Sequence, residues 1–135
     1  MRQHVFSPGF RISSVDVLVL VAGAAATAIL GSMDWMWGFL IGFVVGHFFL
    51  FCNVFRMARP LELIWTAVFT AFASASIILG TPPWFVTIAI STTVTVIVIA
   101  IEMRKPSYHG VGWRRINPNL PGWYEANRAG TRSAV

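Results

Sequence analysis

The chain has 135 residues, of which 56% are hydrophobic and 11% are charged, and its formal net charge is +5. A mean hydropathy of +0.70, carried by long uninterrupted apolar runs, excludes an ordinary soluble domain and indicates a protein that lies mostly in a membrane. Basic loops set the orientation of membrane proteins and lie beside anionic headgroups, so the positive charge needs no nucleic-acid partner, and we expect none.

The sequence divides into an N-terminal arm of residues 1–12, a membrane region of residues 13–102 and a tail of residues 103–135. Four apolar runs fill the membrane region, each near the roughly 20 residues that a helix needs to cross a bilayer. Continuous runs favour helices, because barrel strands alternate apolar and polar residues. We therefore predict an all-α integral membrane protein with four antiparallel transmembrane helices and short loops, at 14–31, 35–56, 60–80 and 83–102.

The ten lysine and arginine residues lie in every second one of the segments outside the apolar runs. They lie in the arm, between the second and third runs, and in the tail, whereas the other two connections have none. Cytoplasmic loops of membrane proteins are enriched in basic residues. The pattern predicts a multi-pass protein of the inner or cytoplasmic membrane with both termini in the cytoplasm.

Several polar residues at the ends of the runs suit helix capping. Ser13 and Asp16 have the spacing of a capping box at the start of the first helix. Asp34 is placed to cap the second helix, and Pro60 and Glu62 suit the first turn of the third. Asp16 could alternatively be a proton or cation site, but its place at the membrane edge favours capping.

Small residues recur at helical spacing in the first two runs. Gly38, Gly42 and Gly46 follow one another every four residues, and the first run offers Gly23, Thr27 and Gly31 at the same spacing. Such stripes let helix backbones approach closely. We predict that they pack the first two helices together, and contact between different chains is the alternative.

His47 is the histidine that lies within a predicted span. Its imidazole could ligate haem iron or the magnesium of a chlorophyll, as a single axial ligand or in a site completed by another subunit. Alternatively, it is a neutral histidine hydrogen-bonded to a hydroxyl of the fourth helix, with Thr87, Ser91 and Thr95 as candidates. A lone histidine has no spacing that would decide between them.

Charged and amide side chains gather at the cytoplasmic boundary of the predicted helices. We expect them to form an ion network that holds the helix ends, and a binding site is the alternative. Glu102 ends a helix, where negative charge is unfavourable, and it needs a partner such as Lys105. The members of this network are Asn53, Arg56, Arg59, Glu62 and Glu102.

The tail is rich in glycine, proline and asparagine, so we predict it to be irregular. It is also rich in aromatic and arginine residues, which anchor protein interfaces. We predict that tail and arm dock a partner, although the rings could instead lie on lipid headgroups. The docking candidates are Phe6, Phe10, Tyr108, Trp113, Arg114, Arg115, Trp123 and Tyr124.

No catalytic motif or metal-ligand spacing is present in the sequence. The leading hypothesis is a non-catalytic accessory subunit of a larger membrane complex, respiratory or photosynthetic, with other integral membrane subunits and bound lipids as partners. The second is a haem- or chlorophyll-binding subunit that uses His47. The third is a small homo-oligomeric transporter or channel, although small multidrug transporters depend on a carboxylate deep in the first helix, where this chain has none.

Overall fold

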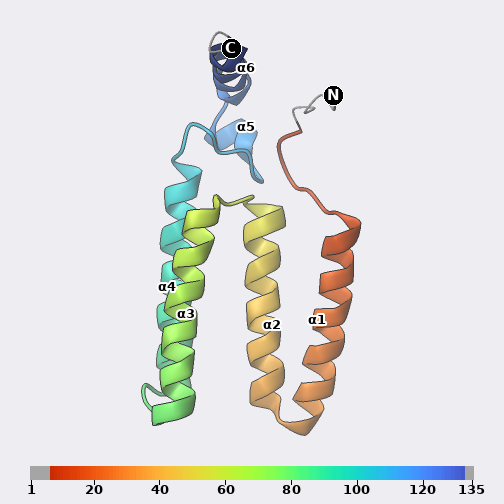
Figure 1. Ribbon diagram of the computed structural model, residues 1–135, viewed down its shortest axis with the longest axis vertical. Helices are drawn as coiled ribbons and strands as arrows, with labels where there is room; N and C mark the ends of the chain where they lie inside the picture. Colours follow the sequence, from red (N-terminus) through yellow and green to blue (C-terminus); the bar gives the residue numbers. More distant parts are fainter. Residues whose placement is uncertain (1–6, 133–135) are drawn as a thin grey trace. The chain divides into compact units, whose positions relative to one another are not determined.

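The computed structural model describes residues 7–132, with the side chains of residues 7–127. These residues form helices and no strand, which confirms the all-α prediction. Figure 1 shows them in chain order: α1 (Ser14–Met33), α2 (Trp35–Phe49), the π-helix η1 (Leu50–Val54), α3 (Arg59–Leu79), α4 (Trp84–Met103), α5 (Trp113–Ile116) and α6 (Leu120–Arg132).

Within residues 7–132, four helical segments are long and apolar enough to cross a membrane. They are α1, α2 continued by η1, α3 and α4, with 20 or 21 residues each. About 20 residues cover the hydrocarbon core of a bilayer. Their bounds differ from the predicted ones by two residues at most.

The predicted caps fix three of the helix starts. Ser13 Oγ accepts a hydrogen bond from Asp16 N at 3.2 Å while Asp16 Oδ2 accepts from Ser13 N at 2.7 Å, which is the reciprocal capping box. Asp34 Oδ1 accepts from Met36 N at 2.8 Å at the start of α2. Pro60 lies in the first turn of α3, where a helix has no use for the missing N–H.

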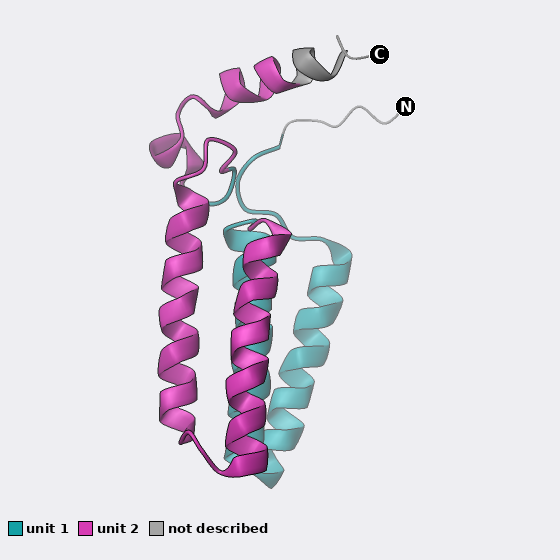
Figure 2. Cartoon of the chain, turned by 60° about the vertical axis from the view of Figure 1, so that its left-hand side comes forward, with its two compact units in different colours: residues 1–56, 109–111 teal, residues 57–108, 112–135 magenta. Residues whose placement is uncertain are grey.

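The chain forms two compact units, which Figure 2 shows in separate colours. Among the described residues, unit 1 contains 7–56 and 109–111, and unit 2 contains 57–108 and 112–132. Within unit 1, α1 packs against α2, and within unit 2, α3 packs against α4. Each pair therefore has its own interface.

The interface of α3 and α4 is built from hydroxyl groups. Ser76 Oγ donates to Pro82 O at 2.7 Å and lies 2.8 Å from Thr87 Oγ1, and both side chains are buried. Further along, the Trp65 indole Nε1 donates to Ser91 O at 3.0 Å. Small hydroxyl residues suit a membrane interface because they allow close packing and satisfy each other's polar groups.

The predicted irregular tail is wrong in one part, because α6 is a helix of 13 residues. Pro121 and Gly122 contribute to the glycine- and proline-rich composition that predicts an irregular tail, but they fall in the first turn of α6. A proline is tolerated there because the first N–H groups of a helix have no intrahelical acceptor. The residues that follow are compatible with a helix.

The second predicted helix is also not α-helical throughout. Its last turn, Leu50–Val54, is a π-helix, and Phe55 N donates to Leu50 O at 3.0 Å across five residues. The wider turn changes the direction of the side chains that follow. No sequence signal distinguishes this turn from the α-helix before it.

Candidate functional site

The glycines of α2 meet α1 at close range. A Cβ on Gly38 would lie 2.5 Å from Gly31 Cα and 2.8 Å from Thr27 O, so only glycine fits there. A Cβ on Gly42 would lie 3.4 Å from the Thr27 side chain. Gly31 and Thr27, which the spacing in the first helix singled out, thus meet the glycines of α2.

The two remaining packing candidates behave differently from each other. A Cβ on Gly23 would lie 2.8 Å from the Val45 side chain, so this glycine of α1 also receives α2. A Cβ on Gly46 would have nothing within 4 Å. The stripe is therefore used for packing inside the chain over part of its length and is open at Gly46.

His47 lies on the surface of its own helix, between two phenylalanine rings. Its Nδ1 is 2.8 Å from Phe43 O, and the ring centroid is 4.2 Å from that of Phe43 and 5.7 Å from that of Phe51. A carbonyl oxygen only accepts, so Nδ1 carries the proton in this contact and the lone pair of a neutral ring lies on Nε2. That tautomer is the one that ligates a metal through Nε2.

The expected hydroxyl partners of His47 are engaged elsewhere. Thr87 Oγ1 bonds with Ser76, while Ser91 and Thr95 donate to the carbonyl oxygens of Thr87 and Ser91 on their own helix. The i−4 carbonyl of its own helix is a partner of Nδ1. A hydrogen bond from the fourth helix, which belongs to the other unit, stays a prediction.

Asn53 connects the arm to both helices of unit 1. With its amide nitrogen facing the oxygens, it donates to Arg11 O at 2.7 Å and to Asp16 Oδ2 at 3.0 Å. Arg11 N in turn donates to the Asn53 backbone oxygen at 3.3 Å. Asn53 is buried, with 2% of its surface exposed. Asp16, assigned to capping from the sequence, thus also anchors the end of η1.

The arm makes further hydrogen bonds within unit 1. Arg56 Nη1 donates to Ser7 O at 2.7 Å, and Gly9 N donates to His109 O at 2.7 Å. Burial and the positive charge of Arg11 lower the pKa of Arg56 below its usual value. The arm is therefore fixed at several points along its described length.

The predicted ion network divides between the two units. Asn53 and Arg56 belong to unit 1, where they bind Asp16 and the arm. In unit 2, Lys105 Nζ lies 2.7 Å from Glu102 Oε2, which supplies the partner that Glu102 was expected to need. Arg59 is exposed and Glu62 is half-buried at the start of α3. A network that joins all five residues stays a prediction.

The tail folds around Tyr108 and Leu120, which are 0% and 2% exposed. Asn117, which ends α5, donates from Nδ2 to Pro106 O and, at 3.3 Å, to Tyr108 O. Burial and the nearby carboxylate of Glu102 raise the pKa of Tyr108. Tyr108 was a docking candidate, but a fully buried ring supports the fold of the tail and presents no surface to a partner.

The other docking candidates reach the surface to different degrees. Phe10 is 55% exposed and Trp123 is 37% exposed. Trp113 and Tyr124 are half-buried, while Arg114 and Arg115 are exposed. Phe6 lies outside the described residues.

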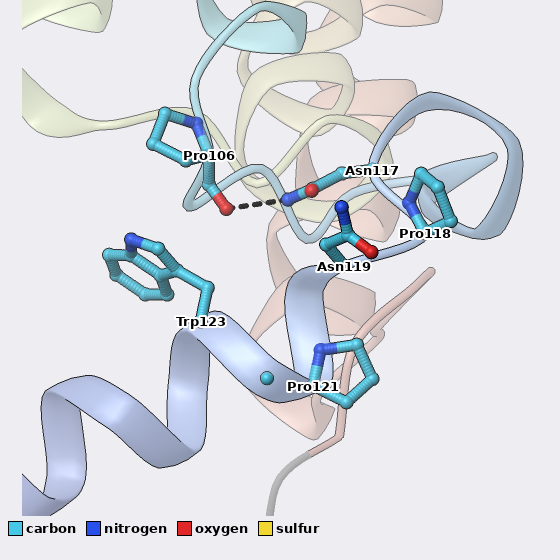
Figure 3. Close-up of a pocket in the computed structure, with 7 residues that line it drawn as sticks. Pro106, Asn117, Pro118, Asn119, Pro121 and Trp123 are labelled. Carbon is cyan, nitrogen blue, oxygen red and sulfur yellow. Dashed lines mark hydrogen bonds between the residues drawn. The ribbon is translucent and has the colours of Figure 1, made fainter.

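A cavity of about 530 Å³ opens beside the start of α6. Figure 3 shows Pro106 and Trp123 on one side of it and Pro118 and Pro121 on the other. The walls are mostly proline rings and one indole, and within the described residues no cluster of three metal-ligating side chains occurs.

In comparisons with protein-family models, curated proteins and solved structures, no significant match to this chain is found.

Proposed function

We propose that the chain is a non-catalytic accessory subunit of a larger membrane complex. Its four helices insert as antiparallel spans with both termini in the cytoplasm, and it docks through helix faces, arm and tail. An energy-converting complex, respiratory or photosynthetic, is the proposed setting. One observation carries the proposal: the described parts of the arm and the tail are hydrogen-bonded, yet they display exposed aromatic side chains.

Aromatic residues on a fixed backbone favour a docking role because they bury much area at little cost in conformational entropy. Phe10 contacts Phe49 edge-on at a centroid distance of 6.0 Å, so its exposed ring is held in place. Trp123 is positioned by α6, where its backbone N donates to Asn119 O at 3.0 Å. A fixed position and an exposed ring are the features of an anchor residue, and Phe10 and Trp123 have both.

The helix faces supply a second surface. Trp37, Phe39 and Phe48 on α2 are 48%, 45% and 40% exposed. They lie outside the glycine contact with α1 and are available to lipid or to another subunit. Gly46, with open space over its Cβ position, lies in the same helix and allows a close approach.

The proposal is tested by gentle detergent extraction from native membranes, followed by identification of the proteins that co-purify. Wild type should recover other membrane subunits in fixed stoichiometry, and a Phe10→Ala/Trp123→Ala variant should lose them. Ile78→Ala is the matched control, since Ile78 is 78% exposed at the other end of α3. Recovery of the wild-type chain alone would contradict the proposal.

A second candidate function is cofactor binding at His47, which the bond from Nδ1 to Phe43 O favours. Haem or chlorophyll bound at Nε2 would give the purified complex a visible absorption band that His47→Ala removes. His109→Ala is the control outside the spans. A colourless complex that contains all its partners would eliminate this candidate.

A further inference from the structure

Three arginines follow the fourth span without an acidic partner. Arg104, Arg114 and Arg115 are exposed, and no carboxylate of the described residues lies within 4.0 Å of their guanidinium nitrogens. Glu102, near Arg104 in sequence, is 3% exposed and already paired with Lys105. The positive charge of this surface is therefore not compensated inside unit 2.

The position of α5 relative to the span is fixed by Asn117. This residue ends α5 and donates to Pro106 O, three residues after the last residue of α4. Figures 1 and 2 both show α5 beside the end of α4. The headgroup layer extends about 5 to 7 Å beyond the hydrocarbon on each side of a bilayer. If α4 spans the membrane to Met103, then α5 lies at headgroup depth.

The side chains of α5 have the composition of a headgroup-binding element. Arg114 lies over the Trp113 ring at 5.7 Å from its centroid, and Ile116 is 37% exposed. Tryptophan is enriched at membrane interfaces, and basic residues close to the cytoplasmic leaflet are attracted by its anionic lipids. An acidic protein surface is complementary in charge, but at this depth it would have to displace the headgroups.

We propose that α5 binds the phosphate groups of anionic phospholipids through Arg114 and Arg115, with Trp113 in the headgroup layer and Arg104 adding to the attraction. The proposal goes beyond the accessory role, because such a lipid site is present whether or not partner subunits bind. It also assigns these two arginines to lipid, leaving Phe10 and Trp123 for protein docking.

Native mass spectrometry of the full chain in detergent tests the lipid site. The protein is titrated with phosphatidylglycerol or with phosphatidylcholine of the same acyl chains. Wild type should bind phosphatidylglycerol more tightly, and added salt should reduce the difference. In Arg114→Gln/Arg115→Gln the affinity for phosphatidylglycerol should fall roughly 30-fold, the effect of losing two basic residues near an anionic surface, while phosphatidylcholine binding stays unchanged.

Arg128→Gln/Arg132→Gln removes the same charge closer to the chain end and should keep the preference. The two arginines that the test variant replaces, Arg114 and Arg115, are exposed in wild type. The helix content and thermal unfolding of the variant should therefore match those of wild type. Equal binding of the two lipids by wild type, or equal loss in the two double variants, would overturn the proposal. So would a test variant that keeps its lipid preference but loses co-purifying subunits, because α5 would then bind an acidic protein.

Discussion

At the scale of single residues, Asn53 is a buried polar side chain that links separate segments of unit 1. Its amide joins Arg11 O of the arm to Asp16 Oδ2 of α1, and its own position comes from the π-helical turn η1. A buried amide is tolerated only when its hydrogen-bonding groups are satisfied. The stability of the arm should therefore depend on this side chain.

Replacing Asn53 by leucine keeps the branched shape of the side chain and removes both donors. We expect Asn53→Leu to lower the free energy of unfolding by about 1 to 3 kcal/mol, since it leaves part of a carboxylate and a carbonyl without partners. Thermal unfolding in mild detergent measures the effect. Asn127→Leu is the control, because that side chain is exposed, lies inside α6 and should change stability by less than about 0.5 kcal/mol. Similar losses in both variants would show that Asn53 has no special role.

Tyr108 provides a prediction about pH. Its pKa is raised by burial and by Glu102, so the folded state holds the phenolic proton more tightly than an unfolded chain, whose tyrosine pKa is about 10. Stability from this group is therefore fully present below pH of about 10 and is lost as the pH rises through the folded pKa. In Tyr124→Phe, where Tyr108 is the one remaining tyrosine, phenolate absorbance should appear at higher pH in the folded protein than in the unfolded chain. Coincident titrations would contradict the burial of Tyr108.

At the scale of helix pairs, α1 and α2 are held by backbone proximity. The two helices approach so closely at Gly38 that a single methyl group would overlap Gly31 Cα. Attraction between helices in lipid comes largely from such close packing, since lipid tails are as apolar as the side chains. This interface is therefore sensitive to small increases in side-chain size.

Gly38→Ala and Gly46→Ala form a matched pair within α2. We expect Gly38→Ala to destabilise unit 1 by about 1 to 3 kcal/mol through overpacking. Gly46→Ala should be neutral or stabilising, because its Cβ meets nothing and alanine is the better helix former. Unfolding in increasing SDS distinguishes them. If Gly46→Ala were destabilised and Gly38→Ala were not, the close contact with α1 would lie at Gly46 and not at Gly38.

The other pair, α3 and α4, depends on hydroxyl groups and should respond to their removal. Thr87→Val deletes the contact with Ser76 Oγ at 2.8 Å and should cost about 0.6 to 1.7 kcal/mol, the range for hydrogen bonds between membrane helices. Thr93→Val is the control, since Thr93 is exposed and bonds only to Ala89 O of its own helix. Urea or SDS unfolding compares the two variants, and equal losses would show that the contact between Thr87 and Ser76 adds nothing beyond the removal of a hydroxyl group.

At the scale of the whole molecule, the arrangement of basic residues predicts orientation. In a Cys52→Ser background, Ser32→Cys near the first connection should react with a membrane-impermeant maleimide in intact cells. Ser7→Cys in the arm should react only after permeabilisation. Both serines are exposed, so the reaction of each introduced cysteine with the maleimide reports on which side of the membrane that residue lies. Labelling of Ser7→Cys in intact cells would reverse the proposed topology.

Much of the helical architecture could be predicted from local features. Ser13, Asp34 and Pro60 mark helix starts because a cap acts on backbone groups only two or three residues away. The helix in the tail is harder to predict from the sequence, because Pro121 and Gly122 usually form turns. They are tolerated in α6 because they lie in its first turn.

The sequence by itself determined the number of apolar helices, because the hydrocarbon thickness and the need to pair every backbone group act on each segment separately. Only the tertiary structure decided that Asn53 binds Asp16, that Gly46 is open and that Tyr108 is buried. Each of these depends on which residues, distant in the chain, meet the side chain. Composition and spacing constrain the helices but not the contacts between their faces.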